Sequence, residues 1–208
     1  AGNFPVEADS IIAANPSITW TRNYLGVTSQ DAVSVNEAMT QAANGGASVL
    51  LYNGHGSAAR LGAAAPRILD TDTVQAWNGN VVFIAATCTF NWVAKDENGY
   101  HSIPIQAMVQ PQGGMAASIA TTTYMESAPA VEFTKQLLSQ SQSLGAKARW
   151  GDVLLRAQQW AYSQSSAPAN GSWYLDLSKT ESILGDPAMP VYSKTSAPVQ
   201  STNVPGAF

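Results

Sequence analysis

The chain has 208 residues, enough for one domain with a sizeable core and too few for two ordinary domains. Only 12% of its residues are charged and the formal net charge is −4, so it lacks the dense positive charge with which proteins bind nucleic acid or anionic membranes. No apolar run approaches the roughly 20 residues of a membrane-spanning helix. We therefore expect neither nucleic acid nor a membrane as a partner.

The residue types favour an exported protein. Ser, Thr, Asn, Gln, Ala and Gly take the place of the Lys and Glu that many cytosolic surfaces carry. The single cysteine, Cys88, excludes an internal disulfide framework. No His or Cys cluster has metal-ligand spacing and no glycine-rich phosphate loop is present, so we expect no metal and no cofactor.

Strand-like and helical patterns alternate along the chain. The expected strands are short apolar, β-branched runs at 47–54, 80–88 and 113–123, with a closing strand within 184–192. The expected helices lie at 35–45, 71–77, 102–110, 128–142 and 146–164. This alternation predicts an α/β fold, a three-layer α/β/α sandwich around a mostly parallel sheet.

A histidine and the cysteine follow two neighbouring strands. His55 comes directly after the first strand, and Cys88 ends the second. Functional loops of such sheets gather at the carboxyl ends of the strands. The spacing of His55 and Cys88 along the chain therefore allows the two residues to lie together at one edge of the sheet. An imidazole beside a thiol accepts its proton and makes the thiolate nucleophile. Taken singly, His55 could be a structural histidine and Cys88 a buried, inert thiol. Together the two residues favour a catalytic dyad.

Glycines flank the histidine on both sides. Gly54 and Gly56 let the backbone approach a substrate closely, and we expect the amide N–H groups of Gly56 and Cys88 to stabilise an oxyanion. Asp70 or Asp72 could orient His55, although Asp72 is explained more simply as an acidic residue in the first turn of the helix expected at 71–77, where it interacts favourably with the helix dipole.

The loops after the second and third strands are expected to border the substrate cleft. The expected cleft residues are Asn91, Trp92, Tyr124 and Met125. Asp96 and Glu97 could belong to the same cleft, but a solvated turn explains them better. His101 is interpreted as a surface or capping residue.

Four motifs, taken in order, resemble the gingipain family of cysteine endopeptidases, which shares a caspase-like fold with legumain, clostripain and the caspases. They are "YNGHGS", "FIAATC", "QGGMAASIATTTYMES" and "LGDPAMPVY". The resemblance implies that His55 is the general base or acid and Cys88 the nucleophile that forms a thioester acyl-enzyme. It also implies an oxyanion hole from the amides of Gly56 and Cys88. A bacterial, secreted or cell-surface endopeptidase acting on peptide or protein substrates is expected.

The family carries further strands ahead of the region matched here. The resemblance therefore implies a caspase-like domain over 1–192 that lacks the first strands, with a Pro/Ser/Thr-rich tail or linker at 193–208. Another chain would then supply the missing N-terminal strands. The rival hypothesis is a non-catalytic binding or assembly module, or an incomplete fragment, that retains the fold.

Overall fold

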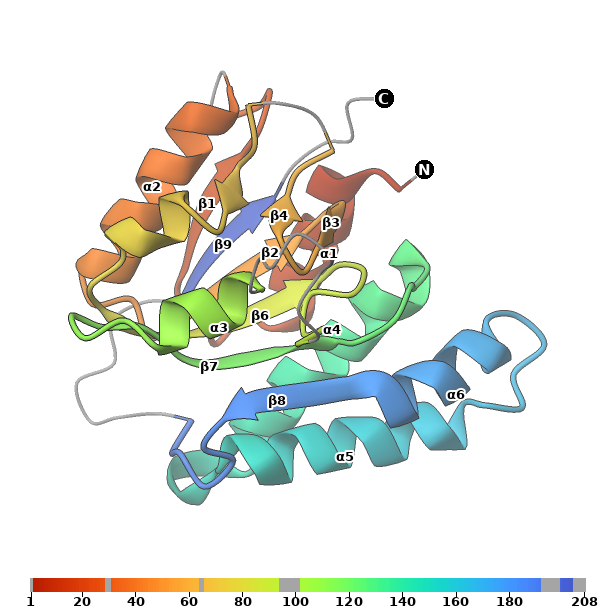
Figure 1. Cartoon of the computed structure of the whole chain (residues 1–208). Coiled ribbons are helices and arrows are strands. Elements are labelled where there is room, and N and C mark those ends of the chain that lie inside the picture. Colours follow the sequence, from red (N-terminus) through yellow and green to blue (C-terminus); the bar gives the residue numbers. More distant parts are fainter. Residues whose placement is uncertain (1, 29–30, 64–65, 94–101, 192–198, 204–208) are drawn as a thin grey trace.

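A mostly parallel sheet runs through the centre of the molecule (Figure 1). The computed structural model describes residues 2–28, 31–63, 66–93, 102–191 and 199–203. Within them the sheet has six strands, in the order β1 (Trp20–Tyr24), β9 (Val199–Asn203), β2 (Val49–Asn53), β6 (Asn80–Ala86), β7 (Gly114–Thr121) and β8 (Glu181–Gly185). All neighbours pair in parallel except β7 and β8, which are antiparallel. The α/β class and the mostly parallel sheet are confirmed.

Helices cover both faces of the sheet and bury two separate cores. One face is covered by α2 (Ala32–Asn44) and α3 (Ile103–Met108). The other is covered by α1 (Phe4–Ala14), α4 (Ser127–Ser143), α5 (Trp150–Ser163) and α6 (Gly171–Thr180). The expected three-layer sandwich is therefore present.

The sequence of strand β2 is apolar from Val49 to Tyr52 for a structural reason. Its side chains alternate between the faces, with Leu50 and Tyr52 in the core under α2 and with Val49 and Leu51 in the core under α4. All five of its residues are buried. Since neither face meets water, the strand reads as a continuous apolar run.

Two of the helices, α1 and α2, begin where a polar side chain accepts a hydrogen bond from one of the first N–H groups. Asp31 Oδ1 accepts a hydrogen bond of 2.8 Å from Ser34 N and so starts α2 at Ala32, three residues before the expected start. Asn3 Oδ1 accepts a longer bond, 3.4 Å, from Val6 N at the start of α1. Pro5 in the first turn of α1 has no N–H group that needs a partner.

Several expectations differ from the structure. Helices α1 and α6 and strand β1 were not predicted, and the expected helix at 71–77 is the short 3₁₀-helix η1 (Thr73–Ala76). The closing strand, expected within 184–192, is β8, which begins at Glu181 and ends at Gly185, before the turn at Asp186 and Pro187. Asp186 Oδ1 accepts from Ala188 N at 2.8 Å, which fixes the turn directly behind the strand.

The segment expected as a tail contributes a strand. Residues 199–203 form β9 between β1 and β2, where Gln200 pairs with Thr21 on one side and with Leu50 on the other. Backbone pairing on both sides satisfies the N–H and C=O groups whatever the side chains are, which explains a strand in a polar sequence. Residues 192–198 and 204–208 lie outside the described residues.

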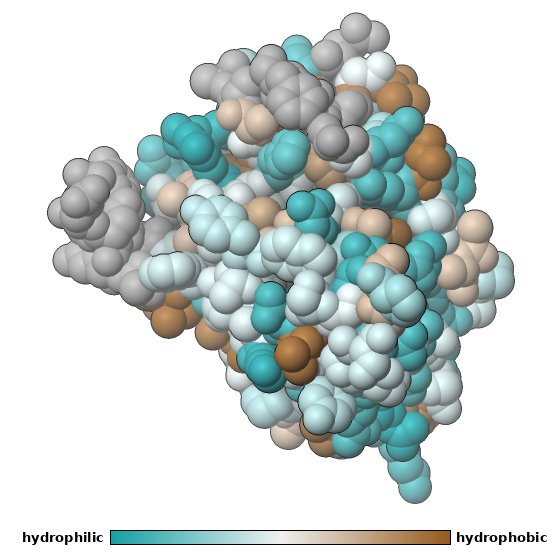
Figure 2. Space-filling view, turned by 90° about the vertical axis from the view of Figure 1, so that its right-hand side faces the viewer, coloured by the Kyte–Doolittle hydropathy of each residue, from teal (hydrophilic) through white to brown (hydrophobic). Residues whose placement is uncertain are grey.

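A small antiparallel sheet follows β2 at its carboxyl end. It consists of β3 (Gly56–Ser57), β4 (Arg60–Leu61) and β5 (Leu69–Asp70). Figure 2 views the side of the molecule toward which the parallel strands run, and its apolar side chains are scattered among polar ones. Among the described helices none is both long and apolar enough to cross a membrane.

Candidate active site

The register between β2 and β6 brings His55 and Cys88 to one place. Asn53, the last residue of β2, is the partner of Ala86, the last residue of β6, and Gly54 N donates to Ala86 O at 3.3 Å. Both chains leave the sheet there, and His55 and Cys88 line the same cavity of about 360 Å³. The prediction that the two residues lie on neighbouring loops at one sheet edge is confirmed.

Four segments of the chain enclose this cavity. They contribute Gly2 and Phe4 from the start of α1, Gly54 and His55 after β2, Ala86, Thr87 and Cys88 at the end of β6, and Met125, Glu126, Ser127 and Ala130 at the start of α4. The N-terminal residues were not expected here, because no helix was predicted at the start of the chain.

A buried tyrosine fixes the backbone at His55. Tyr52 Oη donates to the carbonyl oxygen of His55 at 2.6 Å, and Gly62 N donates to the same oxygen at 2.9 Å. Complete burial raises the pKa of Tyr52 well above its usual value, so the hydroxyl remains a donor. A Cβ atom at Gly54 would lie 2.6 Å from Tyr52 Oη, so this position requires a glycine.

The imidazole of His55 meets an aromatic ring from the N-terminal helix. The rings of Phe4 and His55 have centroids 5.0 Å apart and are almost perpendicular, at 86°. Such edge-to-face pairs are favourable, and Phe4 is 4% exposed. Phe4 therefore borders both the histidine and the cavity.

Cys88 is a free, partly buried thiol on a strained turn. Its Sγ lies 3.7 Å from Met125 O, in the geometry of a weak S–H···O hydrogen bond. Thr89, the next residue, has φ of +48°, in the left-handed region that β-branched residues rarely adopt. Strain of this kind concentrates at functional sites. Thr89 N donates to Thr123 O at 2.8 Å, which holds the strained turn against the end of β7.

Gly56 packs against the residue before the cysteine. A Cβ at Gly56 would lie 2.7 Å from Thr87 Oγ1 and 3.1 Å from Arg60 O, so the loop after β2 passes close to the side chain of the residue before Cys88. This closeness fits the oxyanion hole expected from the N–H groups of Gly56 and Cys88, which stays a prediction.

The four expected cleft residues lie in three different environments. Met125 lines the cavity. Trp92 and Tyr124 are 50% and 76% exposed, and neither is among the described residues that line it. Asn91 is buried, and its Nδ2 donates to Ser182 O at 2.9 Å and to Ser118 O at 3.2 Å. The expectation for Asn91 is therefore corrected, because its amide bridges β7 and β8 inside the protein.

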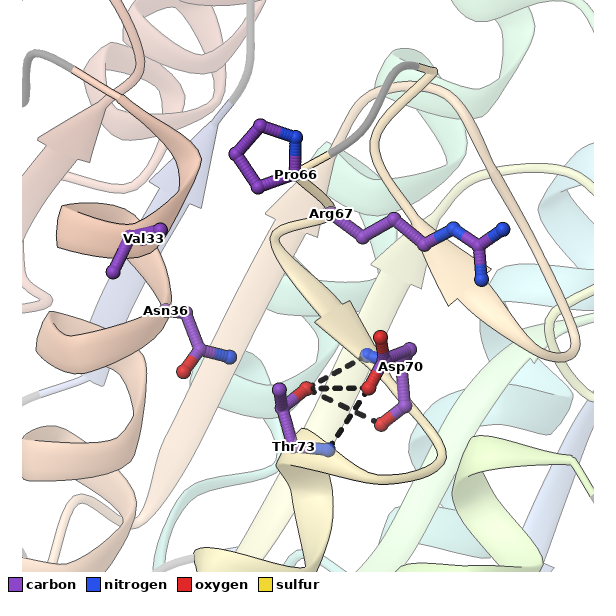
Figure 3. A pocket seen from close by; sticks show the side chains of 6 residues that line it. All are labelled: Val33, Asn36, Pro66, Arg67, Asp70 and Thr73. Atoms are coloured by element: carbon purple, nitrogen blue, oxygen red, sulfur yellow. Dashed lines mark hydrogen bonds between the residues drawn. The ribbon is translucent and has the colours of Figure 1, made fainter.

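Asp70 caps a helix in a second pocket, of about 430 Å³, which Figure 3 shows. Its Oδ1 accepts hydrogen bonds of 2.9 Å from both Thr73 N and Thr73 Oγ1 and one of 3.1 Å from Asp72 N. Burial works against ionisation, but these bonds and the charge of Arg67 outweigh it and lower the pKa of Asp70. Asp70 thus anchors the start of η1, and neither Asp70 nor Asp72 is among the described residues that line the cavity of His55. Asp96, Glu97 and His101 lie outside the described residues.

A carboxylate next to the cavity was missed by sequence reasoning. Glu7 Oε2 accepts from Ser127 Oγ at 2.6 Å and from Asn53 Nδ2 at 3.2 Å, and so connects α1 with the ends of β2 and the start of α4. Within the described part of the chain, no group of three His, Cys, Asp or Glu side chains is placed to hold a metal ion.

Residues 3–192 of the chain match the protein-family model described as Peptidase family C25. No curated protein matches the chain.

Solved structures with a similar fold include three proteases. The chain resembles the Arg-specific cysteine proteinase gingipain R (RgpB) with 21% identity and a TM-score of 0.58, covering 74% of this chain and 36% of that one. A complex of the RgpB pro- and mature domains of Porphyromonas gingivalis matches with 20% identity and a TM-score of 0.55, covering 76% and 38%. A structure described as a protease matches with 15% identity and a TM-score of 0.58, covering 73% and 37%. These likenesses confirm the caspase-like fold of the gingipains, and this chain spans little more than a third of each relative.

Proposed function

The chain belongs to peptidase family C25, and on that premise we propose that it carries the catalytic dyad of a cysteine endopeptidase, with His55 and Cys88 as its members. The observation that supports this most strongly is their shared cavity at the ends of two paired parallel strands. The glycines beside His55 and the strained turn after Cys88 are further support.

The proposed reaction is acyl transfer through a thioester. Cys88 Sγ, as a thiolate, attacks the carbonyl carbon of the scissile peptide bond while His55 holds the thiol proton. The N–H groups of Gly56 and Cys88 stabilise the oxyanion, and His55 then protonates the leaving amine. Water attacks the thioester, releases the acid and restores the thiol.

The surroundings of the dyad fit a peptide substrate. The cavity has about the volume of small-ligand pockets and can accept one side chain of a peptide. Met125 forms part of its wall, and Trp92 and Tyr124 are exposed on the loops that follow β6 and β7, where an extended peptide would contact them.

We further propose that a polypeptide segment outside this sequence completes the domain. We also propose that the protein acts outside the cell. The chain covers 36% to 38% of the similar protease chains, which supports a larger functional unit. One of those structures is a complex of pro- and mature domains, which supports a protein partner as well as a peptide substrate. The scarcity of charged residues supports secretion or a cell-surface location.

The same limited coverage favours a second candidate function. A chain that carries only part of a peptidase domain could serve as a non-catalytic binding or assembly module with the same fold. Reactivity at Cys88 distinguishes the two candidates, because only a dyad activates the thiol.

The test is covalent trapping by a peptidyl acyloxymethyl ketone, which requires an activated thiol. Mass spectrometry of the chain is expected to show one adduct, on Cys88, that forms in the folded protein and not in Cys88→Ala. Labelling should stop when urea unfolds the chain and should slow by about 100-fold or more in His55→Ala. Labelling at equal rates in the folded, unfolded and His55→Ala chains would instead identify a binding module.

A further inference from the structure

His55 lies between two glycines. Gly54 and Gly56 have no side chains that could restrict the imidazole between them. A general base must hold its ring nitrogen toward the group that it deprotonates, and misalignment of about 1 Å is costly. Contacts from elsewhere in the chain must therefore limit the rotation of this ring.

The first turn of α1 provides such a contact. The ring of Phe4 lies 5.0 Å from that of His55, is perpendicular to it at 86°, and is itself buried. Perpendicular rings at this separation have a preferred mutual geometry, so a fixed Phe4 favours one orientation of the imidazole.

Hydrogen bonds hold Phe4 in place relative to the histidine. Asn53, two residues before His55, donates through Nδ2 to Phe4 O at 3.4 Å and to Glu7 Oε2 at 3.2 Å. Ser127 Oγ, at the start of α4, donates to the same carboxylate oxygen at 2.6 Å. The first turn of α1 is thus tied to both sides of the cavity.

We propose that Phe4 is a positioning residue that acts through His55, with Glu7 and Asn53 holding its backbone. The proposal rests on the proposed function, since the orientation of the ring matters for catalysis only if His55 is the base. Phe4 also lines the cavity, but in this role its effect on Cys88 passes through the imidazole.

A double-mutant cycle tests this directly. Phe4→Leu keeps an apolar side chain and is expected to slow alkylation of Cys88 by iodoacetamide at pH 7 by about 2- to 10-fold, the factor that corresponds to an aromatic pair. In the His55→Ala background the same substitution should have no effect. Equal slowing in both backgrounds would overturn the proposal, because Phe4 would then act on the fold as a whole. The matched control is Phe133→Leu, which changes a buried phenylalanine of the core under α4 and should leave the rate unchanged.

A second readout does not depend on the function of Cys88. The order of the His55 ring, measured by NMR relaxation of its ¹³C–¹H groups, is expected to fall in Phe4→Leu and to stay unchanged in Phe133→Leu. An unchanged ring order in Phe4→Leu would overturn the positioning role. If His55→Ala itself leaves the alkylation of Cys88 unchanged, the proposed function fails, and the ring order alone then decides whether Phe4 positions His55.

Discussion

The hydroxyl group of Tyr52 donates a hydrogen bond of 2.6 Å to the backbone carbonyl of His55 from a fully buried position. The same hydroxyl accepts from Gly62 N at 3.2 Å, so it joins the end of β2 to the residue that follows β4. The place of His55 at the cavity is therefore fixed from inside the core.

Removal of this hydroxyl should weaken both stability and reactivity. In Tyr52→Phe the free energy of unfolding, measured in urea, is expected to fall by about 1–2 kcal/mol, because a buried hydrogen bond is lost. The pH–rate profile of Cys88 alkylation should move toward that of His55→Ala. Tyr24→Phe is the matched control, since Tyr24 is also buried and donates to Asp9 Oδ1 at 2.7 Å, with neither residue lining the cavity. A control that changes the profile as much as Tyr52→Phe would contradict this role.

Gly56→Ala is expected to separate the two loops of the cavity. Its Cβ would lie 2.7 Å from Thr87 Oγ1, closer than such atoms approach, so Gly56 or Thr87, the residue before Cys88, must move. Trapping of Cys88 by the peptidyl acyloxymethyl ketone should slow by about 10-fold or more, as expected when an oxyanion donor is displaced. Gly26→Ala is the control: Gly26 has φ of +72° and open space around it, so the change strains the backbone and leaves trapping intact. Normal trapping in Gly56→Ala would exclude this glycine from the oxyanion hole.

Asp70→Ala is expected to lower stability without changing reactivity. Its carboxylate caps η1 through Thr73, and loss of such a cap costs about 1 kcal/mol. Because the pKa of Asp70 is lowered in the folded state, its contribution is present above the pKa of the unfolded chain and is lost as the pH falls through the folded value. The stability difference from wild type should therefore narrow in acid. A changed pH–rate profile of Cys88 in this variant would restore Asp70 as a partner of His55.

Ionisation of Glu181 should lower the stability of the folded protein as the pH rises. It is 6% exposed at the start of β8, and among the described residues no group hydrogen-bonds to its Oε2. Burial raises its pKa from the ordinary 4.5 to about 8. Between these two pH values the folded chain retains a proton that the unfolded chain has released, so the free energy of unfolding falls as the pH rises from about 4.5 to about 8.

The variant Glu181→Gln removes this titration. At pH 9 it should be more stable than wild type by a few kcal/mol, and near pH 4 the two should be similar, as urea unfolding at each pH would show. Glu37→Gln, on the exposed side of α2, should follow the wild-type curve. A parallel decline of Glu181→Gln and wild type between pH 5 and pH 8 would show that another group is responsible.

The central strands β2, β6 and β7, and the nearness of His55 and Cys88, could be predicted because their signals are local. Continuous apolar runs and the residues that end them indicated β2 and β6, and parallel pairing then required His55 and Cys88 to lie together. The helix α1 also carries a local signal that was missed, since Phe4, Ala8, Ile11 and Ile12 are its buried residues and have helical spacing.

The remaining contacts depend on chain segments that are far apart in sequence. The burial of Asn91 follows from bonds to Ser118 and Ser182, which are 27 and 91 residues away. The pairing of Phe4 with His55 depends likewise on how α1 docks. The strand β9 has one apolar residue in five, so its polar sequence suggested a tail, and only backbone pairing on both sides reveals the strand.

The central claim, that His55 activates Cys88, is tested most directly by the pH dependence of Cys88 alkylation in wild type and in His55→Ala. The chain has one cysteine, so every adduct reports on that residue. If His55 activates Cys88, wild type should react at a lower pH than His55→Ala, and at pH 7 it should react faster. Identical profiles for the two proteins would contradict it and leave the chain a peptidase fold without a working dyad.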